Sequence, residues 1–163
     1  MQRGKGSEKA VIDFLKRNPE ILGIKDWSEI EEVQEADIDC AIKTIDGHIL
    51  LAEIKSDSWL GKSDNILFEV LRINHTCDPI YSLSLGWSGR TPANYIIYHA
   101  VSVNKIYVFK TNELRRAMQK YTLEAGKNIK ISIVETDNIK TTINILIPFD
   151  YCKEICEVYE IDG

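Results

Sequence analysis

Apolar residues recur along this chain at spacings that alternate between the helical and the extended repeat. The pattern predicts a helix at 7–18, strands at 36–44 and 48–55, a helix at 63–75, strands at 93–101 and 105–110, a helix at 111–121, a hairpin made of 128–134 and 139–147, and a short helix at 150–159. The acidic segment 29–35 fits either a first strand or an irregular approach to one. This order of elements predicts an α/β fold with a central mixed β-sheet flanked by helices.

The strands predicted at 36–44 and 48–55 can pair in two registers, and the loop length decides between them. A two-residue loop would place Cys40 opposite Glu53, and Asp39 on the other face from Glu53. A three-residue loop, with Gly47 in the left-handed conformation, places Cys40 opposite Ala52 and leaves one face entirely apolar. Burying a carboxylate among isoleucines costs several kcal/mol, so we predict the three-residue loop. The other face then carries Asp37, Asp39, Glu53 and Lys55 together.

Two carboxylates and a lysine at this spacing are suited to cleaving a phosphodiester bond. Magnesium takes oxygen ligands, usually one or two carboxylates together with water and substrate phosphate. Asp39 and Glu53 are the predicted ligands, and the backbone carbonyl of Ile54 can add another at the strand edge. Lys55 is predicted to orient the attacking water or to neutralise the charge that develops on the phosphate. An exposed strand face with a cross-strand ion pair is the simpler alternative.

The residues Asp39, Glu53 and Lys55, with apolar Ile54 between the last two, resemble the motif of the PD-(D/E)xK, or restriction-endonuclease-like, nuclease superfamily. The residue pattern of the motif is similar to that of resolvase-like and phage-type members. The resemblance implies a restriction-endonuclease-like core (αβββαβ), here with an added C-terminal hairpin, and it implies a glutamate from the first helix near the metal, for which Glu8 is the candidate. No proline precedes the first aspartate, and either Asp37 or Asp39 can be the main ligand.

Candidates for substrate binding come from two segments after the hairpin. Members of this superfamily often place a polar residue of the next helix near the cleaved phosphate, which points to Glu69 and Arg72, although these two can also form a simple surface ion pair. In the segment 86–92, Arg90 can hold a phosphate and Trp87 can stack on a nucleobase. Alternatively, Trp87 pins this loop to the sheet.

Composition narrows the class of protein further. The chain has 163 residues, 44% of them hydrophobic and 28% charged, which predicts one globular domain with a core at about 7–121 and an extension at about 122–163. The net charge of −5 argues against a protein that binds nucleic acid by phosphate neutralisation alone. No apolar run is long enough to span a membrane and no secretion signal is evident, so we expect a cytoplasmic protein without a membrane partner.

Together these features predict a metal-dependent endonuclease that hydrolyses phosphodiester bonds in DNA. The expected cofactor is Mg²⁺, with Mn²⁺ as a substitute, and a homodimer is a possible form because cutting two strands usually takes two sites. The alternative is a catalytically silent nucleic-acid-binding or assembly module on a nuclease-like scaffold.

Overall fold

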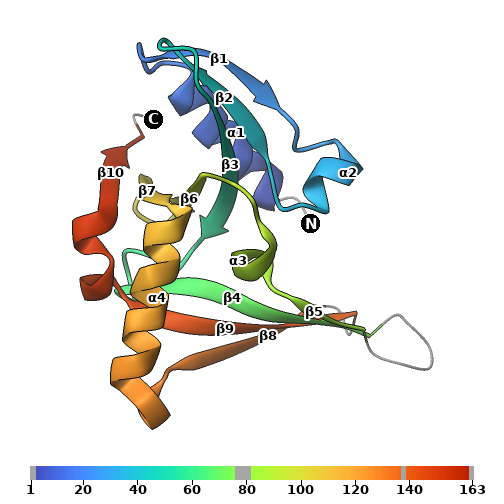
Figure 1. Ribbon diagram of the computed structural model, residues 1–163, viewed down its shortest axis with the longest axis vertical. Helices are drawn as coiled ribbons and strands as arrows, with labels where there is room; N and C mark the ends of the chain where they lie inside the picture. The colour runs from blue at the N-terminus through green and yellow to red at the C-terminus, as the bar shows by residue number, and fades with distance from the viewer. Residues whose placement is uncertain (1–2, 76–81, 137–138, 162–163) are drawn as a thin grey trace.

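The computed structural model describes residues 3–75, 82–136 and 139–161 (Figure 1). Its α-helices are α1 (Arg3–Leu15), α2 (Glu31–Gln34), α3 (Trp87–Arg90) and α4 (Thr111–Ala125), with short 3₁₀ turns at Gly126–Asn128, Phe149–Tyr151 and Lys153–Ile155. Its strands are β1 (Ile21–Asp26), β2 (Cys40–Thr44), β3 (Ile49–Asp57), β4 (Asn65–Asn74), β5 (Ser82–Leu85), β6 (Tyr95–Ala100), β7 (Lys105–Lys110), β8 (Ile131–Thr136), β9 (Lys140–Pro148) and β10 (Cys156–Glu160). None of the helices in these ranges is long and apolar enough to cross a membrane.

The central sheet, here called sheet A, has the strand order β1-β2-β3-β6-β7-β10. Strands β3 and β6 are parallel and the other neighbours are antiparallel, so the sheet is mixed. Helix α1 covers one face, where Val11, Ile12 and Leu15 pack against Ile54 and Ile97. The opposite face packs against α4 and a second sheet. The predicted α/β class, a central mixed sheet flanked by helices, is confirmed.

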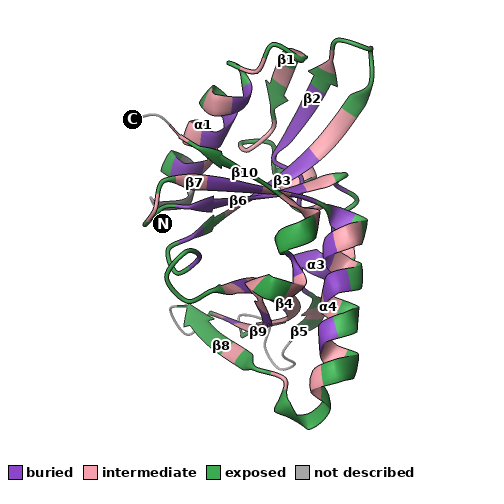
Figure 2. Cartoon of the chain, turned by 90° about the vertical axis from the view of Figure 1, so that its left-hand side faces the viewer, coloured by how far each residue is buried: buried purple, intermediate pink, exposed green. Residues whose placement is uncertain are grey.

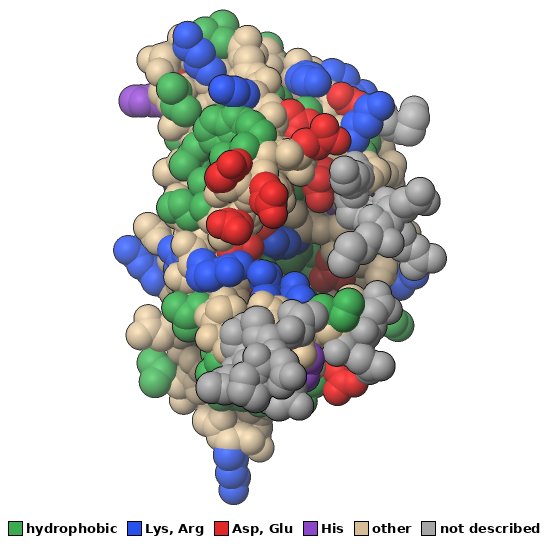
Figure 3. Space-filling model, turned by 90° about the vertical axis from the view of Figure 1, so that its right-hand side faces the viewer, with side chains coloured by type: hydrophobic (Ala, Val, Ile, Leu, Met, Phe, Trp, Pro, Cys, Tyr) green, Lys and Arg blue, Asp and Glu red, His purple; other side chains and the backbone are tan. Residues whose placement is uncertain are grey.

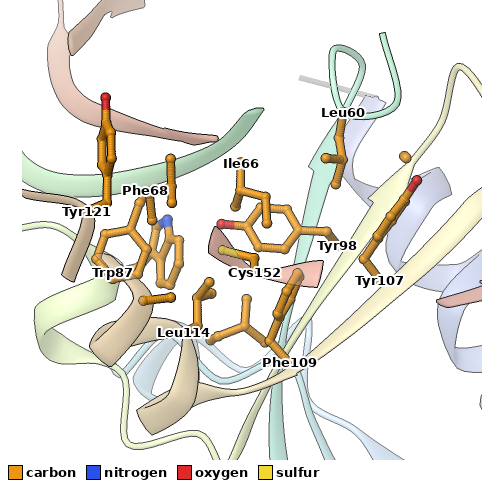
Figure 4. Packing of buried hydrophobic residues seen from close by; sticks show 14 residues of the cluster. Leu60, Ile66, Phe68, Trp87, Tyr98, Tyr107, Phe109, Leu114, Tyr121 and Cys152 are labelled. Carbon is orange, nitrogen blue, oxygen red and sulfur yellow. The ribbon is translucent and has the colours of Figure 1, made fainter. Parts of the chain in front are cut away.

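The second sheet, sheet B, is antiparallel and has the order β5-β4-β9-β8. It lies below sheet A in Figure 1, and α3 lies between the two sheets in both ribbon views (Figures 1 and 2). Buried side chains from both sheets and from α4 form one core, in which the ring centroids of Phe68 and Trp87 are 5.2 Å apart and those of Tyr98 and Phe109 are 6.0 Å apart (Figure 4). This aromatic packing fixes sheet B against sheet A.

The predicted register of the first hairpin is confirmed. Cys40 pairs with Ala52 and Ile42 with Leu50, which are the pairs that a three-residue loop requires. Gly47 has φ +86°, and its N–H donates to the carbonyl of Thr44 (3.0 Å). An L-residue rarely adopts this φ, which explains the glycine at this position.

The helix predicted at 63–75 is wrong, because this segment forms strand β4. Its apolar residues fit a helical stripe, but most of them are also β-branched or aromatic, and both edges of β4 find partner strands. Ile66 and Phe68 enter the core beside α4, while the strand pairs on one edge with β9 and on the other with β5. The helix of the predicted αβββαβ order is therefore replaced by β4, β5 and the four-residue α3.

Three smaller expectations also change. Segment 29–35 is neither a strand nor fully irregular, since it contains α2, and the first strand is β1, which the sequence did not suggest. The closing helix predicted at 150–159 is instead two 3₁₀ turns followed by β10, which pairs with β7. The strands of the C-terminal hairpin are confirmed as β8 and β9, and residues 137–138 of its predicted turn lie outside the described ranges.

Candidate active site

Asp39 stands immediately before β2 and is fixed by hydrogen bonds of both its backbone and its carboxylate. Its backbone N–H donates to the carbonyl of Ala52 (2.9 Å), which extends the hairpin ladder by one step. One carboxylate oxygen, Oδ2, accepts from the backbone N–H of Ile54 (2.6 Å), and the other, Oδ1, accepts from Nε2 of Gln34 in α2 (2.9 Å). The side chain is buried, so the carboxylate is held in one orientation beside β3.

Glu53 lies in the centre of β3 and is 3% exposed. Lys55 forms an ion pair with its Oε1, whereas the buried Oε2 has no hydrogen-bond partner. Burial raises the pKa of Glu53 to about 8, since the attraction of Lys55 offsets this only in part and the charge of Asp39 adds to the rise. An acid with one unpaired buried oxygen is costly in the free protein, and a cation at that oxygen would remove the cost.

Lys55 is two residues further along β3, on the same face as Glu53. Its partner in β6 is Tyr98, and that of Glu53 is Ile96, both of which belong to the core between the two sheets. Both charged residues therefore lie on the face of sheet A that is turned toward sheet B. The Lys55 ammonium lies 5.5 Å from the centre of the Trp87 ring, a cation–π contact that holds it near Glu53.

Trp87 does not have the predicted exposed position for stacking on a nucleobase. Its side chain is 3% exposed and packs between Phe68 and Tyr98 (Figure 4). The structure instead shows the alternative, in which the tryptophan pins the 86–92 segment to the sheet. Its ring acts on the site through Lys55.

Asp37 and Arg90 form an ion pair of 2.6 Å between Oδ2 and Nη2. Asp37 has φ +53°, in the left-handed region, and its carbonyl accepts a hydrogen bond from the Thr91 hydroxyl (2.6 Å). The guanidinium neutralises the Asp37 carboxylate, whereas the Asp39 carboxylate has only neutral donors. This difference favours Asp39 over Asp37 as a metal ligand.

Glu69 and Arg72 lie on strand β4 rather than on a helix, and they form an ion pair of 2.9 Å. The Glu69 carbonyl accepts a hydrogen bond from the Ser88 hydroxyl of α3. A Cβ atom at Gly86 would lie 2.3 Å from the same carbonyl, so only glycine allows the backbone to approach β4 this closely. The two predicted substrate residues thus belong to sheet B, joined to the site through α3.

Glu8 of α1 lines a hollow together with Asp26 and Ser28, on the side of the helix toward the end of β1. Asp39 and Glu53 do not line this hollow, and the metal role of Glu8 stays a prediction.

The described residues contain no ready-made cluster of three or more His, Cys, Asp or Glu side chains for a metal ion. The donor set nevertheless fits a hard divalent cation that keeps several waters, because such an ion needs one or two carboxylates. The N–H of Ile54 points toward Asp39, and the N–H and C=O of one strand residue point to the same side, so the Ile54 carbonyl also faces that carboxylate. Asp39, Glu53 and the Ile54 carbonyl would hold the ion.

The surface around this region is strongly charged. On the side of the molecule where α2 and β5 lie, acidic side chains gather above a row of basic ones, and the surface is hollowed between them (Figure 3). The exposed acids of α2 are Glu31 and Glu32.

Two residues near the site were not assigned a role from the sequence. Gln34 donates to Asp39, and its only sequence signal is a place in the acidic segment just before the motif. Lys140 of β9 is 87 residues away from Glu53 in the sequence, and no local pattern connects it to the hairpin.

No protein-family model and no curated protein matches the sequence. Among solved structures, the chain is similar to "The structure of a bacterial homing endonuclease: I-Ssp6803I", with 15% sequence identity, a TM-score of 0.49, and 68% of each chain covered.

Proposed function

We propose that this protein is a metal-dependent endonuclease that hydrolyses phosphodiester bonds in DNA. The observation that carries the proposal is the buried Glu53 carboxylate, which has one unpaired oxygen and lies beside Asp39 and Lys55. A merely structural ion pair leaves no reason to bury a second, unsatisfied oxygen. The resemblance to the PD-(D/E)xK motif agrees with this interpretation.

Each residue of the site has a distinct task. Asp39 and Glu53 bind the cofactor, Mg²⁺ or Mn²⁺, and Gln34 keeps the Asp39 carboxylate oriented. A divalent cation at such a site supplies positive charge for the phosphate oxygens and activates water for attack. With a cation held by Glu53, the Lys55 ammonium, which pairs with that carboxylate in the free protein, would be available to neutralise the charge that develops on the phosphate.

Arg90 is placed to assist with the substrate. It is part of the segment that contacts the site, and its side chain is 28% exposed beside Asp37. A backbone phosphate can share this guanidinium with Asp37, because arginine presents five donors. A homodimer, which would present two such sites to a duplex, stays a prediction.

The test is cleavage of single-stranded, duplex and branched DNA and of RNA, each with Mg²⁺, Mn²⁺ or a chelator. Asp39→Asn and Glu53→Gln preserve side-chain size, Lys55→Gln removes the ammonium, and each variant should abolish metal-dependent cutting. Glu157→Gln, an exposed strand glutamate on β10, is the matched control and should cut like the wild type.

The alternative function, a nucleic-acid-binding module without turnover, has one observation in its favour. In the free protein the Lys55 ammonium pairs with Glu53 and so occupies one of the two ligands. Under that alternative, the wild type binds nucleic acid but cuts none of the substrates with either metal, and the three site variants bind as well as the wild type.

A further inference from the structure

The ribbon of β4 and β9 carries two cationic side chains on one face. Arg72 pairs with Thr142, and Asn74 pairs with Lys140. Directly opposed residues of an antiparallel pair share a face, and residues two apart on one strand do too, so all four lie on the same side of sheet B. Arg72 and Lys140 are diagonal neighbours on that face.

This face is within electrostatic range of the candidate active site. Burial lowers the pKa of Lys140, and the positive charges of Arg72 and Lys55 lower it further, while Glu69 and Asp37 act in the opposite direction. The Lys140 ammonium is therefore close enough to Lys55 on sheet A for the two positive charges to repel each other. Glu53 and Lys55 also lie on the side of sheet A that is turned toward sheet B.

Helix α3 explains why these distant segments are held together. The Trp87 ring contacts Lys55, and the Ser88 hydroxyl binds the carbonyl of Glu69, the residue that forms the ion pair with Arg72. The guanidinium of Arg115 in α4 donates to the carbonyls of Ser88 and Thr91 (both 2.8 Å) and so ties α3 to α4.

The cationic groups on this face are incompletely matched. Lys140 is half-buried and forms no ion pair with a carboxylate of the described residues, whereas Lys55 and Arg90 each have one. Arg72 has its ion pair with Glu69, but its buried Nε has no hydrogen-bond partner. A half-buried ammonium next to a guanidinium with a free N–H is unfavourable unless an anion binds between them.

We propose that Arg72 and Lys140 form a phosphate-binding site on sheet B, which holds a backbone phosphate of the substrate strand adjacent to the phosphate that is cleaved at Glu53 and Lys55. This inference rests on the proposed nuclease function and deepens it. It assigns sheet B the task of holding the strand, and it explains how a protein with net charge −5 grips a polyanion: the positive charge is gathered at the site.

The test is binding of a labelled DNA duplex and single strand in the presence of a chelator, so that no cutting occurs, as a function of salt concentration. For Lys140→Gln and for Arg72→Gln we expect affinity to fall roughly three- to tenfold and the slope of log K against log salt to decrease by about one, as loss of one phosphate contact requires. Lys140→Arg keeps the positive charge and should keep both the affinity and the salt slope of the wild type. Lys105→Gln is the matched control, because Lys105 is also a strand lysine but pairs with Glu160 at the far edge of sheet A.

Cleavage rates measured over a range of substrate concentrations separate this site from the catalytic one. Lys140→Gln should raise KM and leave kcat within about twofold of the wild type, since the residue binds a phosphate that does not react. Wild-type affinity and an unchanged salt slope in Lys140→Gln would overturn the phosphate site while leaving the nuclease proposal intact. Conversely, a Lys140-dependent grip on DNA without cutting by the wild type would refute the nuclease proposal alone.

Discussion

Replacing Glu53 by glutamine should change how the stability of the metal-free protein depends on pH. The pKa of Glu53 is raised from 4.5 to about 8, chiefly because the carboxyl is buried. Its folded-state pKa thus lies above its unfolded-state value, so its contribution to stability is fully present below the unfolded pKa and is lost as pH rises through the folded pKa. The neutral glutamine side chain does not titrate.

The magnitude follows from the two pKa values. Between about pH 5.5 and about pH 9, the free energy of unfolding of the wild type should fall by about 3 kcal/mol more than that of Glu53→Gln. Groups shared by both proteins, including the buried thiols and His99, cancel in this comparison. The attraction of Lys55 is already contained in the pKa of Glu53, so the difference in slope needs no separate correction for the lost ion pair.

The assay is urea unfolding with a chelator present, at several pH values, for the wild type, Glu53→Gln and the exposed-site control Glu157→Gln. The control should run parallel to the wild type. If Glu53→Gln also runs parallel to the wild type, then Glu53 is ionised at neutral pH without cost, and the argument that a cation is needed at its unpaired oxygen fails.

Three further outcomes are expected. Glu53 must lose its proton to bind a cation, so metal affinity measured by calorimetry should rise up to about tenfold per pH unit below pH 8 and level off above it; a flat profile would contradict the raised pKa. Gln34→Ala removes a donor from Asp39 and should weaken metal binding by roughly 10- to 100-fold; equal affinity would show that the orientation of Asp39 does not depend on α2. Gly86→Ala forces a Cβ against the Glu69 carbonyl and should destabilise the protein by about 1–3 kcal/mol in thermal unfolding, whereas Gly23→Ala, with open space around it, should not; equal effects would mean that the contact of α3 with β4 is not tight.

The sequence was most informative where one physical constraint left a single solution. In the first hairpin, only one register keeps Glu53 away from the apolar face, and that register is the observed one. The charged residues of the motif could likewise be located because a nearly apolar strand precedes them. Their roles still depend on the experiments above.

The sequence failed where two structures satisfy the same pattern. Ile66, Leu67, Val70 and Leu71 suit a helical stripe, and they suit equally well a strand with neighbours on both edges and a bulge after Glu69. The choice depends on β9, which is some 70 residues further along the chain, so no local signal could make it. For the same reason the approach of Lys140 to Lys55 was not predictable, because it follows from the pairing of β4 with β9.

The parallel alignment of β3 and β6 imposes a long excursion on the chain, because two parallel neighbours cannot be joined by a tight turn. A helix often fills this requirement, but here the excursion contributes two strands and α3. The connection that the parallel pairing requires thereby forms a surface opposite the candidate catalytic residues. A change in the length or the charge of β4 and β5 would reshape that surface without altering the hairpin that carries Asp39 and Glu53. Substrate specificity and catalytic activity can therefore change independently in descendants of this protein.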